Sequence, residues 1–363
     1  MKSRAAICVG PNRPLEIDLI DVAGPKEGEV LIEIKATGLC HSDYHQIDGS
    51  IPSFPYPVVL GHEGAGVVLE CGPSVTTVRP GDHVIPVAMP ECRQCPNCAS
   101  GRTNLCLKFF EGGARPTPFS WNGQPLAQYS QVGTFSNFTV VSEINVAKIR
   151  ADAPFDSACY VGCGVITGIG SAINAAKVTP GSTVIVFGLG GIGLNVLQGA
   201  RLAGAYKIVA VDTNPRRETI AKQFGATTFV NPRDVNGDIV EHLNALTGGG
   251  ADFTFECVGN TDLMRQAVET ARPGLGVTMI VGAAPTASQF AIQPMSILVG
   301  RTIKGAILGD MKTRSGVPKL IDMYMDGFIN VDDLITHKLP LERINDGFDM
   351  MKKGESIRSV VLF

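Results

Sequence analysis

A strand, a glycine-rich turn and a helix follow one another directly from residue 182 onward. The run STVIVFG (182–188) is continuously apolar, as expected for a strand buried on both faces of a sheet. It leads straight into the turn GLGGIG and a helical stretch. Further β-type runs, at 227–230, 251–259, 276–283 and 301–307, alternate with helical stretches at 214–225 and 260–274. This alternation predicts βαβ units and a parallel sheet.

The glycine turn has the spacing of a phosphate-binding site. Gly188, Gly190 and Gly193 form G-x-G-x-x-G, which permits a tight turn, lets the backbone approach a pyrophosphate and packs helix against strand. Asp212 ends the next strand, about 20 residues on, where an acid binds ribose hydroxyls and repels a 2′-phosphate. The pattern favours NAD over NADP. The alternative for Asp212 is a helix-capping acid, and the nearby Arg217 could help to accommodate a phosphate.

Four cysteines lie close together in ECRQCPNCASGRTNLC. Cys92, Cys95, Cys98 and Cys106 form C-x2-C-x2-C-x7-C, and four such thiolates can bind one tetrahedral Zn²⁺ at about 2.3 Å each. Such a site has no open coordination position, so we expect it to hold a loop together. The alternative is disulfides, but a chain with ten cysteines and no recognisable secretion signal favours metal ligands and free thiols.

A second set of zinc-ligand types is scattered along the chain. A catalytic zinc needs about three protein ligands and an open position, and Cys40 and His62 could supply two of them. Spacing alone leaves several cysteines open as the third ligand: Cys8, Cys71, Cys159, Cys163 and Cys257. On the residues alone, Cys40 as a core thiol and His62 as a structural histidine are equally good interpretations.

Length and composition set further bounds. With 363 residues the chain exceeds one typical core, which predicts two domains. Residues up to about 160 carry short β-type runs broken by Gly and Pro, typical of a mostly antiparallel β domain, and 109–126 is predicted as an irregular surface loop. A net charge of −3 without a basic tract argues against nucleic acid and anionic membranes. Without a signal peptide or an apolar run of about 18 residues, we expect a cytoplasmic protein.

Six ordered motifs resemble those of the zinc-containing medium-chain alcohol dehydrogenases, most closely the longer class I and class III forms. They are GHEGAGVV (61–68), the cysteine array, TFSNFTVV (134–141), GCGVITG (162–168), GLGGIG (188–193) and IRSVV (357–361). The resemblance implies an α/β protein with a GroES-like, mostly-β catalytic domain formed by 1–164 and 308–363. It also implies a Rossmann doubly wound parallel-sheet domain at 165–307 that binds NAD. It further implies a homodimer, joined through the run 282–307.

The resemblance also implies roles for individual residues. Catalytic zinc would bind Cys40, His62 and Cys163, with Glu63 close to the metal. Ser42 would hydrogen-bond the alcohol, and His45 would end a proton relay that runs through the nicotinamide ribose. The predicted cofactor positions are Thr167 and Ile192 at the nicotinamide, Asp212 and Arg217 at the adenosine ribose, His41 and Arg358 at the pyrophosphate, and Gly188, Gly190, Gly191, Gly193 and Val281. The alternatives are a solvated His41, a surface His45 and a structural ion pair for Arg358.

The predicted reaction is reversible, zinc-dependent oxidation of a primary alcohol to the aldehyde, with hydride transfer to NAD. Ala88 stands where many relatives have a bulky aromatic, and Tyr129 aligns with another pocket position, so we expect a bulky or aromatic alcohol. One alternative is a glutathione-dependent formaldehyde dehydrogenase, although the stretch 47–59 lacks the acid expected in that class and Ser42 replaces its usual Thr. The other alternative is a nucleotide-binding relative without dehydrogenase activity.

Overall fold

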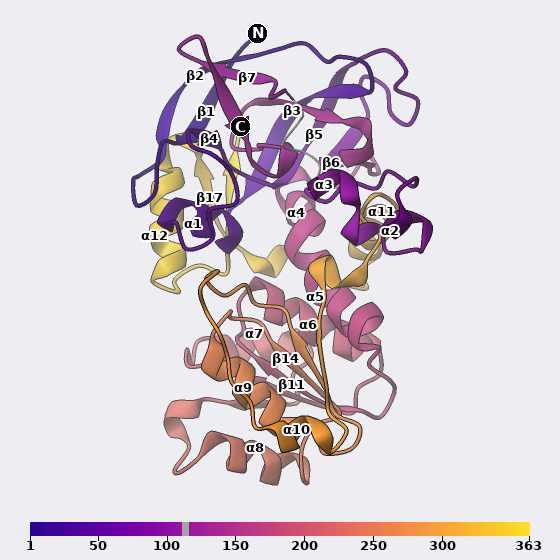
Figure 1. The fold of residues 1–363 in the computed structure, drawn as a ribbon, viewed down its shortest axis with the longest axis vertical. Coiled ribbons are helices and arrows are strands. Elements are labelled where there is room, and N and C mark those ends of the chain that lie inside the picture. The colour runs from indigo at the N-terminus through magenta and orange to yellow at the C-terminus, as the bar shows by residue number, and fades with distance from the viewer. Residues whose placement is uncertain (111–115) are drawn as a thin grey trace. The chain divides into compact units, whose positions relative to one another are not determined.

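The computed structural model describes residues 1–110 and 116–363, which form two compact units. One unit consists of Met1–Cys163 together with Lys312–Phe363, and the other is Gly164–Met311. Figure 1 colours the chain from its N-terminus to its C-terminus, so the first unit combines indigo-to-magenta segments with yellow ones. The catalytic role predicted for the first domain and the NAD-binding role predicted for the second stay predictions.

The first unit is built mainly from antiparallel strands, as predicted. Its strands are β1 (Lys2–Cys8), β2 (Glu16–Val22), β3 (Glu29–Gly38), β4 (Val58–Val59), β5 (Glu63–Cys71), β6 (His83–Pro86), β7 (Phe119–Trp121), β8 (Gln124–Gln128), β9 (Phe138–Ser142), β10 (Val146–Lys148), β17 (Ile335–Pro340) and β18 (Arg358–Leu362). A closed barrel runs β1-β2-β7-β8-β4, and a sheet runs β10-β6-β5-β3-β18-β17 with β9 also paired to β3. Only β4–β8 and β17–β18 pair in parallel among these described strands.

Helices complete the first unit at the ends of its strands. They are α1 (His41–Asp48), α2 (Pro96–Ala99), α3 (Leu107–Phe110), α4 (Phe155–Tyr160), α11 (Thr313–Met325) and α12 (Ile344–Lys352). The apolar residues of β1 from Ala5 to Cys8 are all buried and belong to the same core cluster as Phe119. Along the chain, α1 follows β3 directly, and β5 follows β4.

The loop predicted at 109–126 is partly wrong. Residues 119–121 and 124–128 form the antiparallel pair β7–β8, because Asn122 and Gly123 adopt positive φ angles (51° and 73°) that suit a two-residue hairpin turn. Residues 111–115 of the predicted loop lie outside the described residues.

The second unit is a doubly wound parallel sheet, which confirms the predicted fold class. Its elements are α5 (Ile166–Gly170), β11 (Thr183–Phe187), α6 (Gly191–Leu202), β12 (Lys207–Val211), α7 (Arg217–Gln223), β13 (Thr228–Val230), α8 (Ile239–Thr247), β14 (Phe253–Glu256), α9 (Thr261–Thr270), β15 (Val277–Ile280), α10 (Pro294–Leu298) and β16 (Thr302–Gly305). The strand order β13-β12-β11-β14-β15-β16 reverses at β11, which is the Rossmann topology.

Local sequence explains where the connecting helices of this sheet begin. Asn260 accepts hydrogen bonds from the amides of Asp262 and Leu263, and so caps α9. Asp238 caps α8 in the same way, and Gly248 ends that helix with φ at 72°. Asn260 and Asp238 thus fix where α9 and α8 begin, and Gly248 fixes where α8 ends.

One continuous helical segment, Phe155–Ala176, is long and apolar enough to cross a membrane by length and composition alone. However, 83% of its most apolar window is buried within the protein, which is typical of a core helix.

Candidate metal and cofactor sites

Four of the predicted site residues meet in the first unit. Ligand atoms of Cys40, His62, Glu63 and Cys163 all lie within 4.8 Å of one another. The Cys163 sulfur is 3.4 Å from Nε2 of His62, and the side chains of Cys40, His62 and Glu63 are buried. Cys159, an alternative third ligand, lies outside this group and points its thiol at the carbonyl of Asp156.

The ligand residues sit where secondary structure begins or changes. Cys40 directly precedes α1, and His62 directly precedes β5. Cys163 lies in a π-helical stretch, Val161–Val165, a local widening of the helix that often occurs at functional sites. A Cβ on Gly38 would come within 2.3 Å of a Glu63 carboxylate oxygen, so only glycine in β3 leaves room for that buried acid.

Asp43 is a functional residue that the sequence analysis missed. Its Oδ1 lies 3.1 Å from Nδ1 of His62 and accepts the Gly61 amide, while its Oδ2 accepts the Cys40 amide. The buried carboxylate therefore holds the His62 ring with Nε2 free for a metal, as partner carboxylates do in zinc sites. The available signal was an acid three residues after Cys40, in the position of a capping box at the start of α1.

The charges around this group fit a divalent cation. The hydrogen bond from Cys163 lowers the pKa of the Cys40 thiol, and the same bond raises the pKa of Cys163. Burial raises the pKa of Glu63 to about 8 despite the nearby Arg358, and no described group hydrogen-bonds either Glu63 carboxylate oxygen. Two sulfurs and one imidazole nitrogen are the donors that zinc prefers, so the residues suit the predicted metal.

The predicted relay and pocket residues are placed as follows. Ser42 lies at the ligand group, with its hydroxyl 3.8 Å from the Cys40 sulfur. Tyr129 is buried, donates its hydroxyl to the Ser42 carbonyl, and packs its ring 5.7 Å from that of His62. His45 forms a hydrogen bond of 2.7 Å with the Ser50 hydroxyl. Ala88 is half-buried, just after β6.

The two predicted pyrophosphate contacts differ in exposure. His41, at the start of α1, is exposed. Arg358 is only 5% exposed, donates to the Leu39 carbonyl and lies 4.0 Å from a Glu63 oxygen. The structure thus places Arg358 inside the first unit, beside the zinc-ligand group.

The cysteine array also forms one group. The sulfurs of Cys92, Cys95, Cys98 and Cys106 all lie within 4.8 Å of one another. Separations of 3.8 Å (Cys92–Cys98) and 4.0 Å (Cys95–Cys106) exceed a disulfide bond of about 2.05 Å and fit the edges of a tetrahedron around zinc. Backbone amides of Cys98 and Leu107 lower the pKa of Cys95 to about 6, which favours the thiolate that a metal needs. The four cysteines are free, against the disulfide alternative.

The glycine turn of the second unit has the geometry that its spacing predicts. Gly188 has φ at 87°, and a Cβ on Gly193 would lie 1.8 Å from the Gly188 carbonyl oxygen. No described atom comes within 4 Å of a Cβ built on Gly190, so the backbone is open there to a close ligand. Asp212 accepts the Leu189 amide at 2.7 Å and thereby links the end of β12 to this turn.

The remaining predicted cofactor residues also belong to the second unit. Gly191 and Ile192 begin α6, and Thr167 is buried in α5. Burial lowers the pKa of the Arg217 guanidinium, which the charge of Asp212 partly offsets. Val281 follows β15 and donates its amide to the carbonyl of Glu256.

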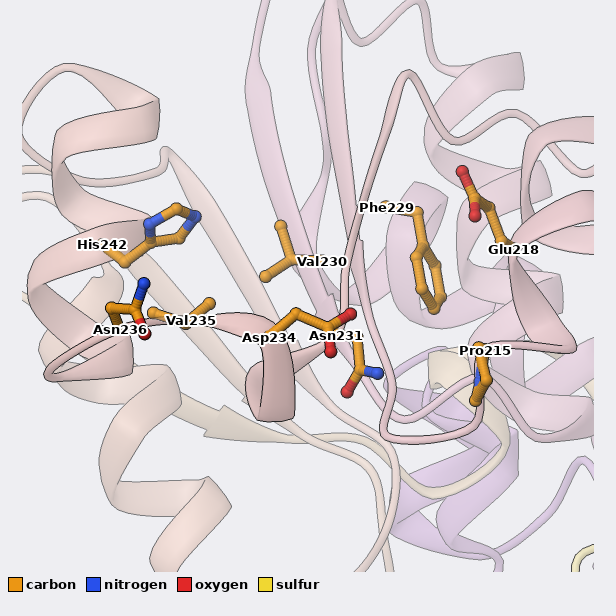
Figure 2. A pocket seen from close by; sticks show the side chains of 9 residues that line it. All are labelled: Pro215, Glu218, Phe229, Val230, Asn231, Asp234, Val235, Asn236 and His242. Carbon is orange, nitrogen blue, oxygen red and sulfur yellow. The ribbon is translucent and has the colours of Figure 1, made fainter.

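A separate pocket of about 560 Å³ lies at the C-terminal end of β13 (Figure 2). It is lined by Pro215, Glu218, Phe229, Val230, Asn231, Asp234, Val235, Asn236 and His242. Most of these side chains are exposed or half-buried, and no predicted site residue is among them. Figure 2 shows them on α7, β13, α8 and the adjoining loops rather than converging on one point.

Two family models match the chain. Residues 26–151 match the alcohol dehydrogenase GroES-like domain, and residues 191–325 match the zinc-binding dehydrogenase model. An alcohol dehydrogenase class-3 of Cereibacter sphaeroides is 51% identical, and an S-(hydroxymethyl)glutathione dehydrogenase of Paracoccus denitrificans is 50% identical, each with 100% of both chains covered.

Solved structures agree over the whole length. A zinc-binding alcohol dehydrogenase domain protein from Burkholderia ambifaria superposes with a TM-score of 0.94 at 33% identity, covering 100% of this chain and 99% of that one. Benzyl alcohol dehydrogenase from Acinetobacter calcoaceticus superposes with a TM-score of 0.91 at 30% identity, with the same coverage.

Proposed function

Since the chain belongs to the zinc-binding alcohol dehydrogenase family, an oxidoreductase family that uses zinc and a nicotinamide cofactor, we propose that it oxidises an alcohol to a carbonyl compound with hydride transfer to NAD. The observation that carries this proposal is the buried group of two sulfurs and one imidazole at Cys40, His62 and Cys163. Three protein ligands of this kind leave a fourth position for substrate.

The chain's own residues then handle the proton and the orientation of the substrate. Zinc, when bound, supplies a Lewis acid that makes the alcohol hydroxyl more acidic. Ser42, whose hydroxyl lies beside Cys40, accepts the hydrogen bond of the alcohol and takes up its proton. Ser42 would give up its own hydroxyl proton as it takes that of the alcohol, and the relay would run through the nicotinamide ribose to His45. His45 lies three residues further along α1 and would release the proton to solvent. Tyr129 fixes the backbone of Ser42 through its hydroxyl.

The cofactor half of the proposal belongs to the second unit, with the first unit as the catalytic domain. A bound nicotinamide would supply the hydride acceptor, and the glycine turn with Asp212 would hold the pyrophosphate and the adenosine ribose. Asp212 should select NAD by repelling a 2′-phosphate. Replacing Asp212 with Gly should lower kcat/KM with NAD by about 10-fold or more and improve use of NADP, since Arg217 remains. An unmodified enzyme that prefers NADP would contradict the assignment.

For the substrate, we place the formaldehyde–glutathione adduct first. Relatives of 48–51% identity over their full length are named S-(hydroxymethyl)glutathione dehydrogenase or alcohol dehydrogenase class-3. This similarity favours the alternative of the sequence analysis over its main prediction, a bulky alcohol.

A bulky primary alcohol is the second candidate. It is favoured by Ala88, a small residue at a predicted pocket position, and by the likeness to a solved benzyl alcohol dehydrogenase. The half-buried Phe54, whose ring centroid lies 5.0 Å from that of Tyr129, adds apolar surface next to Tyr129.

One kinetic comparison separates the candidates. We would measure kcat/KM for the formaldehyde–glutathione adduct, benzyl alcohol, cinnamyl alcohol and ethanol with NAD. The adduct should be oxidised best if the first proposal is right. A preference for benzyl or cinnamyl alcohol, abolished in Ala88→Phe without loss of zinc, would establish the second. Ethanol as the best substrate would exclude both, and no turnover at all would favour the nucleotide-binding alternative.

We also propose that the protein forms homodimers through β16 and α10. Leu275, Met295 and Leu298 are 73%, 59% and 77% exposed in this part of the second unit. β16 pairs only with β15 among the described strands, and an unpaired edge with apolar neighbours favours association. Light scattering should give the mass of two chains. A monomeric mass would contradict the proposal.

A further inference from the structure

Arg358 contacts three separate segments of the first unit. Its Nη1 donates to the Leu39 carbonyl at 3.0 Å, and its Nη2 lies 4.0 Å from a carboxylate oxygen of Glu63. Its guanidinium carbon lies over the ring of Tyr160, 4.3 Å from the ring centroid. From its place at the start of β18, this side chain thus contacts the residue that follows β3, the first residue of β5 and the last residue of α4.

Each of these partners is a close sequence neighbour of one proposed zinc ligand. Leu39 precedes Cys40, Glu63 follows His62, and Tyr160 lies three residues before Cys163. The three segments that must converge on the metal therefore converge on Arg358 as well.

Burial makes the tyrosine ring important to this arrangement. Arg358 is 5% exposed, and Tyr160 and Glu63 are fully buried. A guanidinium removed from water needs charge and π-face partners to remain in place. The Glu63 carboxyl group lies at one edge of the guanidinium, and the Tyr160 ring covers one face.

The close contact with Arg358 is made by the ring face of Tyr160. The Tyr160 hydroxyl has no hydrogen-bond partner among the described residues, and neither does Nε of Arg358. The contact between the two side chains is therefore that of a cation with a ring face. Phenylalanine could replace it, but an aliphatic side chain could not.

We propose that Tyr160 is a positioning residue for the catalytic zinc, because its ring holds Arg358 where that side chain braces the three ligand segments. This rests on the proposed function, which assigns the ligands. Without the ring the guanidinium is free to leave its place between Leu39 and Glu63. The ligand segments then lose a common partner, and the metal is held less firmly.

The test compares Tyr160→Leu with Tyr160→Phe in the full-length, zinc-loaded protein. Zinc released to a chelator is followed over time, and zinc per chain is measured before and after. Tyr160→Leu should release one of its two zinc ions about 10- to 100-fold faster than the unmodified protein, the range expected for groups that orient metal ligands. Tyr160→Phe should release zinc at the unmodified rate.

Two further variants guard against a general loss of stability. Phe119→Leu removes a similar buried ring from β7, a strand that carries none of the proposed zinc ligands, and should leave zinc release unchanged. Arg358→Lys keeps the charge but loses the planar fork, so it should speed release even if Tyr160→Leu fails to fold.

Several outcomes would overturn the proposal. These are normal zinc release by Tyr160→Leu, equal acceleration in Tyr160→Phe, or equal acceleration in Phe119→Leu. Failure of the proposed function looks different, since the unmodified protein would then hold at most one zinc and Cys40→Ser would remove none.

Discussion

The two metal-ligand groups of the first unit are assembled in opposite ways. The cysteine array takes all four sulfurs from Cys92–Cys106, and the backbone amides of this same loop donate to Cys92 and Cys95. The proposed catalytic group joins His62 to Cys163, 101 residues apart, and to Cys40 at the end of β3. The first group depends on its own loop, and the second depends on the whole sheet.

This difference predicts a division of roles. A local loop with few apolar contacts of its own gains much of its order from a bound metal. The proposed catalytic group is held by β3, β5 and a buried helix, so packing largely orders it without a metal. We therefore expect a metal bound there to act in catalysis rather than to stabilise the fold. Substitutions in the two groups should therefore affect different properties.

The largest effect is expected from Cys40→Ser. Loss of one of three ligands should remove one zinc per chain and lower kcat by about 1,000-fold or more, since Lewis-acid catalysis is worth several kcal/mol. The melting temperature should change little, because β3 and α1 remain packed. Zinc analysis, kinetics and calorimetry on the same preparation test this. A large fall in melting temperature with activity retained would reverse the assignment.

Cys98→Ser should instead act on stability. The serine cannot replace the thiolate, so the array loses its metal and the loop loses its order. A cost of about 3 kcal/mol would lower the melting temperature by roughly 6–12 °C. Activity at low temperature should exceed that of Cys40→Ser, and equal melting temperatures for the two variants would remove the distinction.

The same contrast decides what could be predicted from the sequence. The cysteine array and the glycine turn can be predicted from the sequence because the function of each depends on the spacing of residues within a short segment. The third ligand cannot be predicted in this way, since five cysteines were compatible with Cys40 and His62 until resemblance chose Cys163. The fold brings Cys163 to 3.4 Å from His62 and turns the Cys159 thiol to the Asp156 carbonyl, and residue spacing alone does not encode this long-range arrangement.

Asp43 was missed for a related reason. Its role depends on Gly61 and His62, which lie 18 and 19 residues away and come next to it only when α1 packs beside the start of β5. The hairpin β7–β8 was missed because its Pro and Gly content is typical of loops. The local sequence is ordinary in both places. Contacts with other parts of the chain decide the role of Asp43, and strand pairing decides the β7–β8 hairpin.

A smaller effect should follow from Asp43→Asn, which keeps the shape of the side chain but removes its charge. His62 then loses the carboxylate that fixes its ring, and zinc affinity or kcat should fall about 10- to 100-fold. Asp48→Asn, on the same helix, is the matched control and should leave both unchanged. Zinc competition titrations measure the difference. An Asp43→Asn protein with normal zinc affinity would show that the sheet alone orders the ligands.

The smallest effect is expected from Cys159→Ser, and it tests how finely the fold discriminates between neighbouring thiols. Cys159 lies one helical turn before Cys163, is fully buried, and donates to the Asp156 carbonyl rather than facing His62. A serine hydroxyl can make the same hydrogen bond, so we expect a loss of about 1 kcal/mol or less. Both zinc ions should remain, whereas Cys163→Ser should lose one. If Cys159→Ser loses zinc and Cys163→Ser keeps it, the third ligand is Cys159. The thiol that binds zinc would then differ from the Cys163 thiol, which lies next to His62 in the structure.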